Sequence, residues 1–399
     1  MTSDVGISQK WRFWPIMCLA FFYPINNSLV NLAIPLYFFN QGLEIFLIGF
    51  LVAGFFITYC FSPLLLNKMG DKLGRKRSII IALLGTSIAQ IIFYFTLEPL
   101  MFLISRMIEG FVMGLFWTSL QSSISDKNST KNENYISRYN LSWNSGALLG
   151  FLVGTIILLN IDDVSIIFYT APILIFINLI ISIVFFQETK KHKDNDETSQ
   201  NLNVKSNFEL NRIYIPVVLP ILLVLAFGLA KNSINFSYPI KSEIIGFQTY
   251  TVYLLAFLTI LTQLISTTFA TYLKITVLKK ITVMSLVALI IINILLGINY
   301  NFFVFILLFL LLGLFAGTLY SFGLKLSILL NIQYHTSKYT SINESILGTT
   351  YLITPIICGY IAIINLNLSF YAISLGLFSM LILYSFFLKQ MKLKNILLH

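Results

Sequence analysis

Six charges are concentrated in the stretch Asn67-Lys68-Met69-Gly70-Asp71-Lys72-Leu73-Gly74-Arg75-Lys76-Arg77, between two apolar runs that contain almost none. Five of the charges are cations, and the single acid is Asp71. Loops beside membrane spans collect Lys and Arg on the cytoplasmic side. The stretch therefore indicates a cytoplasmic loop between two spans, and it orients the spans on either side of it.

The composition is that of a membrane protein, because 57% of the 399 residues are apolar and only 11% are charged. A soluble domain carries about 25% charged residues. The net charge of +10 does not require a nucleic-acid partner, since it follows from the cations of loops on one side of the membrane. We expect the lipid bilayer, and no nucleic acid, among the partners.

Twelve apolar runs are each about as long as a membrane-spanning helix, which needs about 20 residues. They are apolar on nearly every face and lack the strict alternation of membrane β-strands, so we predict an all-α polytopic fold. The runs are 11–39, 44–66, 78–97, 99–124, 136–160, 164–186, 213–240, 247–273, 281–298, 302–324, 342–365 and 369–388.

The cations favour one orientation. With a cytoplasmic N-terminus, 23 of the 26 Lys and Arg residues fall on the cytoplasmic side. Only Lys241 falls in an outer loop, while Arg106 and Lys231 fall within spans. This asymmetry predicts a multi-pass protein of the cytoplasmic membrane with both termini in the cytoplasm.

A long polar stretch divides the chain into halves with six spans each. We predict an N-terminal bundle at 1–186, a cytoplasmic linker at 187–212 and a C-terminal bundle at 213–399. Short matches between the halves, such as Gly114-Leu115-Phe116 with Gly313-Leu314-Phe315, recur at separations of 199 to 205 residues. These matches indicate two pseudo-symmetric six-helix bundles.

The order of residues in the charged stretch resembles the loop between the second and third helices of major facilitator superfamily transporters. The match covers Asp71, Lys72, Gly74, Arg75 and Lys76, while Asn67 stands where the family has Gly. The resemblance implies a twelve-helix carrier that works by alternating access, with spans 1, 4, 7 and 10 around a central path.

The resemblance also implies a cytoplasmic gate. In the family the aspartate meets the start of helix 11, near Ser341–Glu344 here, and the arginine pairs with an acid at the end of span 4, which is Asp126 here. We therefore assign Asp71, Gly74, Arg75 and Asp126 to a gate that holds the two halves together.

Three ionisable residues lie inside predicted spans, where charge is costly and often functional. Arg106 and Glu109 are three residues apart and thus share a helix face, which fits an intrahelical salt bridge. The run Arg106-Met107-Ile108-Glu109-Gly110 also resembles the family's fourth helix, which implies a coupling role with Glu109 as a proton acceptor. Lys231, in span 7, favours an anionic or zwitterionic substrate unless it pairs with Glu109.

Amide side chains occupy matched positions in spans 1 and 7. They either bond between helices or face a wet cavity, and the family's central path favours the cavity. The predicted cavity residues are Asn26, Asn27, Asn31, Trp143, Asn144, Lys231, Asn232, Asn235 and Tyr320.

Span 5 carries glycines at a spacing of four, Gly146, Gly150 and Gly154, which suits close helix packing. The run partly resembles the antiporter pattern of the family's fifth helix, but Phe151 stands in place of its proline. The pattern therefore favours efflux only weakly, and packing explains the glycines as well.

We predict a secondary transporter of a small organic solute across the cytoplasmic membrane, with efflux weakly favoured and protons as a candidate coupling ion. The alternatives are an uptake symporter or passive facilitator for a sugar or metabolite, and a non-transporting membrane sensor. No cluster of nucleophiles, acids or metal ligands suggests an enzyme, a metal site or a cofactor. We expect a monomer.

Overall fold

The computed structural model describes residues 4–125, 132–186, 214–334 and 338–391, and in these ranges the chain is helical without a β-strand. The first half comprises α1 (Asp4–Asn40), α2 (Ile45–Tyr59), α3 (Ser62–Leu73), α4 (Arg75–Ile91), the 3₁₀ turn η1 (Ile92–Tyr94), α5 (Pro99–Ser125), α6 (Asn132–Asn160) and α7 (Ser165–Phe185). The second half comprises α9 (Val218–Asn232), the π-helical segment η3 (Ser233–Ser237), α10 (Tyr238–Ile245), α11 (Tyr250–Tyr272), α12 (Ile275–Ile298), α13 (Phe302–Gln333), α14 (Lys338–Ala362) and α15 (Leu366–Leu388).

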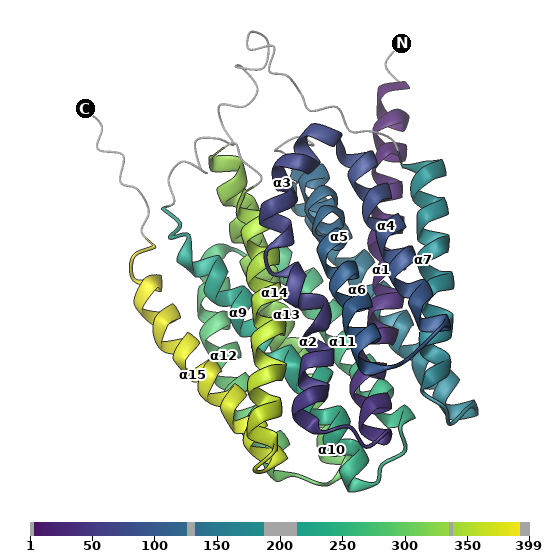
Figure 1. Ribbon diagram of the computed structural model, residues 1–399. Coiled ribbons are helices and arrows are strands. Elements are labelled where there is room, and N and C mark those ends of the chain that lie inside the picture. The colour runs from purple at the N-terminus through teal and green to yellow at the C-terminus, as the bar shows by residue number, and fades with distance from the viewer. Residues whose placement is uncertain (1–3, 126–131, 187–213, 335–337, 392–399) are drawn as a thin grey trace.

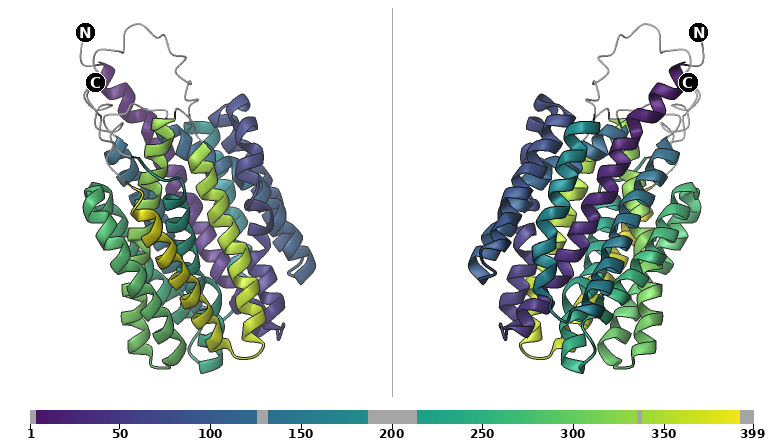
Figure 2. Two further views of the ribbon diagram at one scale, coloured as in Figure 1. Left: turned by 90° about the vertical axis from the view of Figure 1, so that its left-hand side faces the viewer. Right: turned by 90° about the vertical axis from the view of Figure 1, so that its right-hand side faces the viewer.

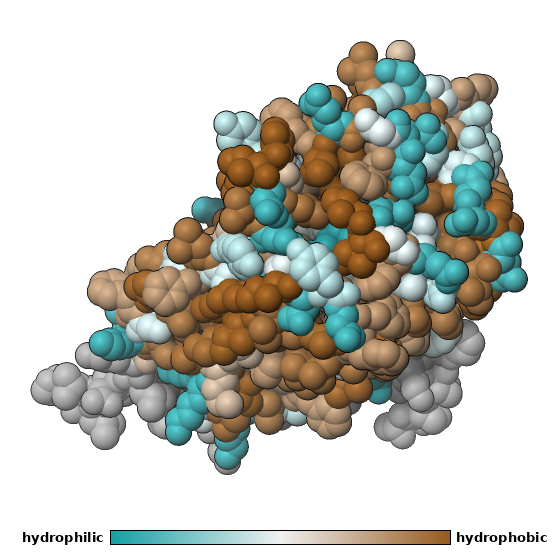
Figure 3. All heavy atoms as spheres, turned by 90° about the horizontal axis from the view of Figure 1, so that it is seen from below, coloured by the Kyte–Doolittle hydropathy of each residue, from teal (hydrophilic) through white to brown (hydrophobic). Residues whose placement is uncertain are grey.

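Twelve helical segments of the described residues are long and apolar enough to cross a membrane, which confirms the predicted number of spans. Three of them are composite, because α2 continues into α3, α4 continues into η1, and α9 continues through η3 into α10. Hydrophobic side chains dominate the end of the molecule seen from below, with hydrophilic ones scattered among them (Figure 3).

The helices lie roughly parallel in one bundle (Figures 1 and 2). Helices α1–α7 pack mainly on one another, and so do α9–α15, while α6 packs against α11 and α2 against α14 across the divide. Helix α1 begins at the upper end of Figure 1, which also carries the turn between α3 and α4, and α15 rises from the lower end towards it. Which side of a membrane this upper end faces stays a prediction, as do the bundle boundaries. The predicted linker lies wholly outside the described residues.

Lys241, which was predicted in an outer loop, and Lys325 lie buried in helices, where each caps the carboxyl end of a neighbouring helix. Lys241 in α10 donates from Nζ to the carbonyl oxygens of Leu296 (2.7 Å) and Gly297 (2.8 Å) at the end of α12. Lys325 in α13 donates to the carbonyl oxygen of Thr271 (2.8 Å) near the end of α11. The negative end of a helix dipole stabilises a cation, and this explains why the outer-loop assignment of Lys241 was wrong.

The glycine stripe of span 5 brings helices into contact. A Cβ atom on Gly146 would lie 1.9 Å from the carbonyl oxygen of Phe21, and one on Gly150 would lie 2.6 Å from that of Ile25, both in α1. Gly154 faces the ring of Tyr253 in α11 instead. The stripe therefore lets α6 approach α1 within one half and α11 in the other, as small residues do in membrane helix pairs.

We expect the substitution Gly146→Ala to lower the free energy of unfolding by about 1–3 kcal/mol, because the backbone oxygen of Phe21 cannot move away as a side chain can. The matched control is Gly376→Ala, whose Cβ atom would meet only the end of the Leu229 side chain at 3.3 Å. Thermal unfolding of the purified proteins in detergent measures both. Equal melting temperatures for the two variants would contradict the packing role.

Candidate functional site

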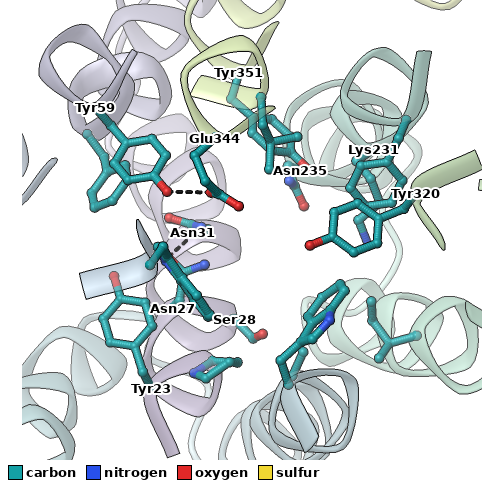
Figure 4. A pocket seen from close by; sticks show the side chains of 18 of the residues that line it. Tyr23, Asn27, Ser28, Asn31, Tyr59, Lys231, Asn235, Tyr320, Glu344 and Tyr351 are labelled. Carbon is teal, nitrogen blue, oxygen red and sulfur yellow. Dashed lines mark hydrogen bonds between the residues drawn. The ribbon is translucent and has the colours of Figure 1, made fainter. Parts of the chain in front are cut away.

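A cavity of about 160 Å³ lies between the two halves (Figure 4). The first half lines it from α1, α2, α5 and α6, and the second half from α9, η3, α11, α13 and α14. Its walls are largely aromatic: the ring of Tyr320 lies 4.9 Å from that of Phe227 and 5.3 Å from that of Trp143, measured between centroids. The cavity can therefore hold a small organic molecule with an apolar or planar body.

Six of the nine residues predicted for the cavity do line it: Asn27, Asn31, Trp143, Lys231, Asn235 and Tyr320. Asn26, Asn144 and Asn232 are buried but face elsewhere. Asn26 bonds with Gln90 and with the carbonyl oxygen of Ala171, inside the first half. Asn232 donates to the carbonyl oxygen of Gly228 in its own helix.

Asn144 joins the two halves instead of facing the cavity. Its Oδ1 accepts a hydrogen bond of 2.7 Å from Gln263 of α11, and its Nδ2 donates to Thr267 Oγ1 at 3.3 Å. Towards the lower end of the bundle, the hydroxyl of Tyr253 donates to the carbonyl oxygen of Leu29 at 2.6 Å. These polar contacts join α11 of the second half to α6 and α1 of the first half.

Lys231 is 7% exposed and lines the cavity near the middle of the α9–α10 span. Among the described residues, its ammonium group has no ion pair or hydrogen bond of its own. The predicted alternative, a pair with Glu109, is wrong because Glu109 is bound to Arg106. A buried ammonium without a partner is costly and marks a candidate ligand site.

Arg106 and Glu109 form the expected salt bridge within α5, at 2.6 Å between Nη1 and Oε2, and neither lines the cavity. Glu109 also accepts from Gln90 at 3.1 Å, and Arg106 donates from Nη2 to Asn31 Oδ1 at 2.7 Å. Asn31 donates in turn to Asn27 at 3.0 Å. A chain of polar contacts thus connects the buried pair to the cavity wall, while its coupling role stays a prediction.

Glu344 is a charged cavity residue that sequence reasoning assigned only to the start of helix 11. It lies six residues inside α14, and its carboxylate accepts 2.5 Å hydrogen bonds from Tyr59 Oη and from Gln121 Nε2. Both donors belong to the first half, so this carboxylate links the two halves (Figure 4). A signal was available, since an acid inside an apolar run is a functional candidate by default.

The charged stretch at 67–77 is not a loop. Residues up to Leu73 belong to α3 and those from Arg75 to α4, and the helices join at Gly74, whose φ of 88° suits glycine. Arg75 is buried at the start of α4, and Lys76 donates to the carbonyl oxygen of Ile183 in α7. The side chain of Asp71 and the whole of Asp126 lie outside the described part of the chain, so the gate contacts stay predictions.

Comparison with known proteins decides the family. A family model described as Major Facilitator Superfamily matches residues 16–274. The chain belongs to this superfamily. It is therefore a transporter-family protein and not an enzyme, with the fold of twelve membrane helices in two pseudo-symmetric six-helix bundles.

Two individual proteins resemble this superfamily member. The structure of the human organic anion transporter MFSD10 (TETRAN) matches with a TM-score of 0.69 and 13% identity, over 94% of this chain and 99% of that one. The tetracycline resistance protein, class B, of Escherichia coli is 25% identical over 168 residues. That alignment covers 41% of this chain and 40% of the relative. The first likeness shows the fold, and the second spans less than half of the relative's length.

Removal of one partner from the Arg106–Glu109 pair should destabilise this transporter-family protein more than removal of both. Glu109→Ala leaves a buried guanidinium uncompensated, which costs about 3–5 kcal/mol, whereas a double change to Met at both positions removes both charges. Thermal unfolding in detergent measures the two variants against Glu44→Ala, which deletes an exposed carboxylate. A double variant less stable than Glu109→Ala would contradict the pairing argument.

Proposed function

We propose that the protein is a secondary transporter that carries a small organic solute across the membrane by alternating access. The observation that carries this proposal is the central cavity, which both halves line and which contains the ammonium of Lys231, without a partner among the described residues. A ligand there touches both halves at once, so its binding can bias how they pack on each other.

The contacts between the halves suit such a movement. They run mainly along two helix pairs, α6 with α11 and α2 with α14, and α11 also bonds to α1. Water can replace these hydrogen bonds when the helices separate. Opening the α6–α11 side requires the loss of the Asn144–Gln263 and Tyr253–Leu29 bonds. Opening of the cavity past Glu344 requires the loss of its bonds with Tyr59 and Gln121.

We propose export as the direction and protons as the coupling ion. The distant tetracycline resistance relative supports export. Glu109 is proposed as the coupling carboxylate, because its partner Arg106 reaches the cavity wall through Asn31, and displacement of Asn31 by a solute would disturb the pair. The contrasting functions are an uptake symporter or passive facilitator, and a sensor that binds ligand without flux.

A flux screen in proteoliposomes tests transport, with tetracycline and a set of organic anions as the first solutes, with and without an imposed pH gradient. We expect saturable flux that depends on the gradient, and we expect the gradient to lose its effect in Glu109→Gln, which keeps the side-chain shape. An unchanged pH response in that variant would rule out Glu109 as the coupling group. Binding without flux would favour the sensor.

Alternating access requires the halves to separate between Gly154 of α6 and Tyr253 of α11. A Cβ atom on Gly154 would lie 3.1 Å from Cγ of Tyr253, so the double variant Gly154→Cys/Tyr253→Cys places two thiols within disulfide reach. We expect the oxidised double variant to lose flux and to regain it after reduction. The single variant Tyr253→Cys, oxidised in the same way, is the control.

Full flux through the oxidised double variant, with the disulfide confirmed by mass spectrometry, would contradict separation of the halves at this side of the cavity. The native cysteines Cys18, Cys60 and Cys358 are free in the structure and remain in both variants, so they do not affect the comparison.

A further inference from the structure

The cavity holds two opposite charges that do not neutralise each other. Lys231 and Glu344 are the charged residues among those that line it, and no ion pair within 4.0 Å joins them. Figure 4 shows the carboxylate of Glu344 beside Tyr59, and Lys231 on the opposite side beside Tyr320. The cavity therefore has a cationic pole and an anionic pole with space for a ligand between them.

The cationic pole is equipped to bind an anion. An ammonium group has three donors, and those of Lys231 find no acceptor among the described residues. Asn235 lies four residues further along the same span, lines the cavity as well, and has no hydrogen bond to a described side chain or backbone group. Together they offer charge and amide donors to a carboxylate or a similar group.

The anionic pole retains acceptor capacity. An ionised carboxylate offers about four lone-pair sites, and Glu344 uses two of them for the neutral donors Tyr59 and Gln121. Tyr351 and Tyr139 also line the cavity; Figure 4 shows Tyr351 near Glu344, and the hydroxyl of Tyr139 accepts from Gln121 at 3.5 Å. A carboxylate beside aromatic rings is a favourable site for a protonated amine.

We propose that the transported solute is amphoteric, with an anionic group bound by Lys231, a protonated amine bound by Glu344 and an apolar or aromatic body between them. This inference rests on the proposed transport function. A solute with both groups compensates both poles at once. A solute with a single charge leaves the charge at the other pole without a partner. Because the surroundings are apolar, the desolvation of that pole is then not compensated, and this costs binding free energy.

A matched set of single-ring compounds tests the inference: 4-(aminomethyl)benzoate carries both charges, 4-methylbenzoate only the anion, and 4-methylbenzylamine only the cation. The biphenyl homologues repeat the set at a longer spacing. Binding to the purified full-length protein is measured by equilibrium dialysis and by thermal stabilisation. We expect an amphoteric compound of one spacing to bind about tenfold more tightly than both of its singly charged counterparts.

Substitutions of Lys231 and Glu344 test which charged group of the compound each residue binds. In Lys231→Met the amphoteric compound should bind no better than the amine, and in Glu344→Gln no better than the benzoate. Lys280→Met and Glu44→Gln remove one charge of each sign at exposed positions outside the cavity and should keep the wild-type order. Because the order of the compounds on the wild-type protein is itself a result, the test does not depend on the stability of the cavity variants.

A wild-type protein that prefers a singly charged compound at both spacings, or that binds no amphoteric compound more tightly than its counterparts, would overturn the inference. So would an unchanged preference in Lys231→Met and Glu344→Gln. Failure of the transport proposal looks different, because amphoteric compounds would then bind in the expected order without entering proteoliposomes. Flux of solutes irrespective of their charge would support the transport proposal and refute the preference for amphoteric solutes.

Discussion

An apolar surrounding makes every charge expensive unless something nearby compensates it, and the interior of this protein is arranged around that cost. Arg106 is compensated by Glu109 within one helix, with Gln90 and Asn31 completing the network. Lys241 and Lys325 are compensated by the carbonyl oxygens at helix ends, and Lys241 also lies 4.6 Å from the ring centre of Tyr300. Lys231 has no such partner among the residues that the structure describes, and it is also the lysine that lines the cavity.

The contacts within each half differ from those hydrogen bonds between the halves that water can replace. Within the first half, Gly146 and Gly150 bring α6 against backbone oxygens of α1, and such close packing leaves little room for movement. Glycines also bring helices together between the halves, as Gly49 of α2 does against the carbonyl oxygen of Pro355 in α14. Polar side chains meet there as well: Asn144 with Gln263, and Glu344 with Tyr59 and Gln121. Hydrogen bonds of this kind are exchanged for water at small net cost. Exchangeable bonds of this kind between the halves would suit the proposed alternating access.

Sequence alone was sufficient for the span count, because a membrane helix needs an apolar run whose length the bilayer sets. It was also sufficient to find Lys231 and Asn235, since a charge or an amide in such a run is conspicuous. It did not decide which way a side chain faces. Asn26 and Asn27 are adjacent, so roughly 100° of helix rotation separates them; one bonds within the first half and the other lines the cavity. The role of Glu344 depended on Tyr59 and Gln121, more than 200 residues away in the chain.

Lys231 and Glu344 both belong to the second half, on α9 and α14, whereas Tyr59 and Gln121 belong to the first. In the proposed cycle the two poles keep their mutual distance and move together, while the cavity wall formed by the first half changes its position relative to them. Movement of one elementary charge through a membrane potential of 100 mV involves about 2.3 kcal/mol of electrical work. Since the two formal charges move together and cancel, the membrane potential does little net work on this pair when the second half moves.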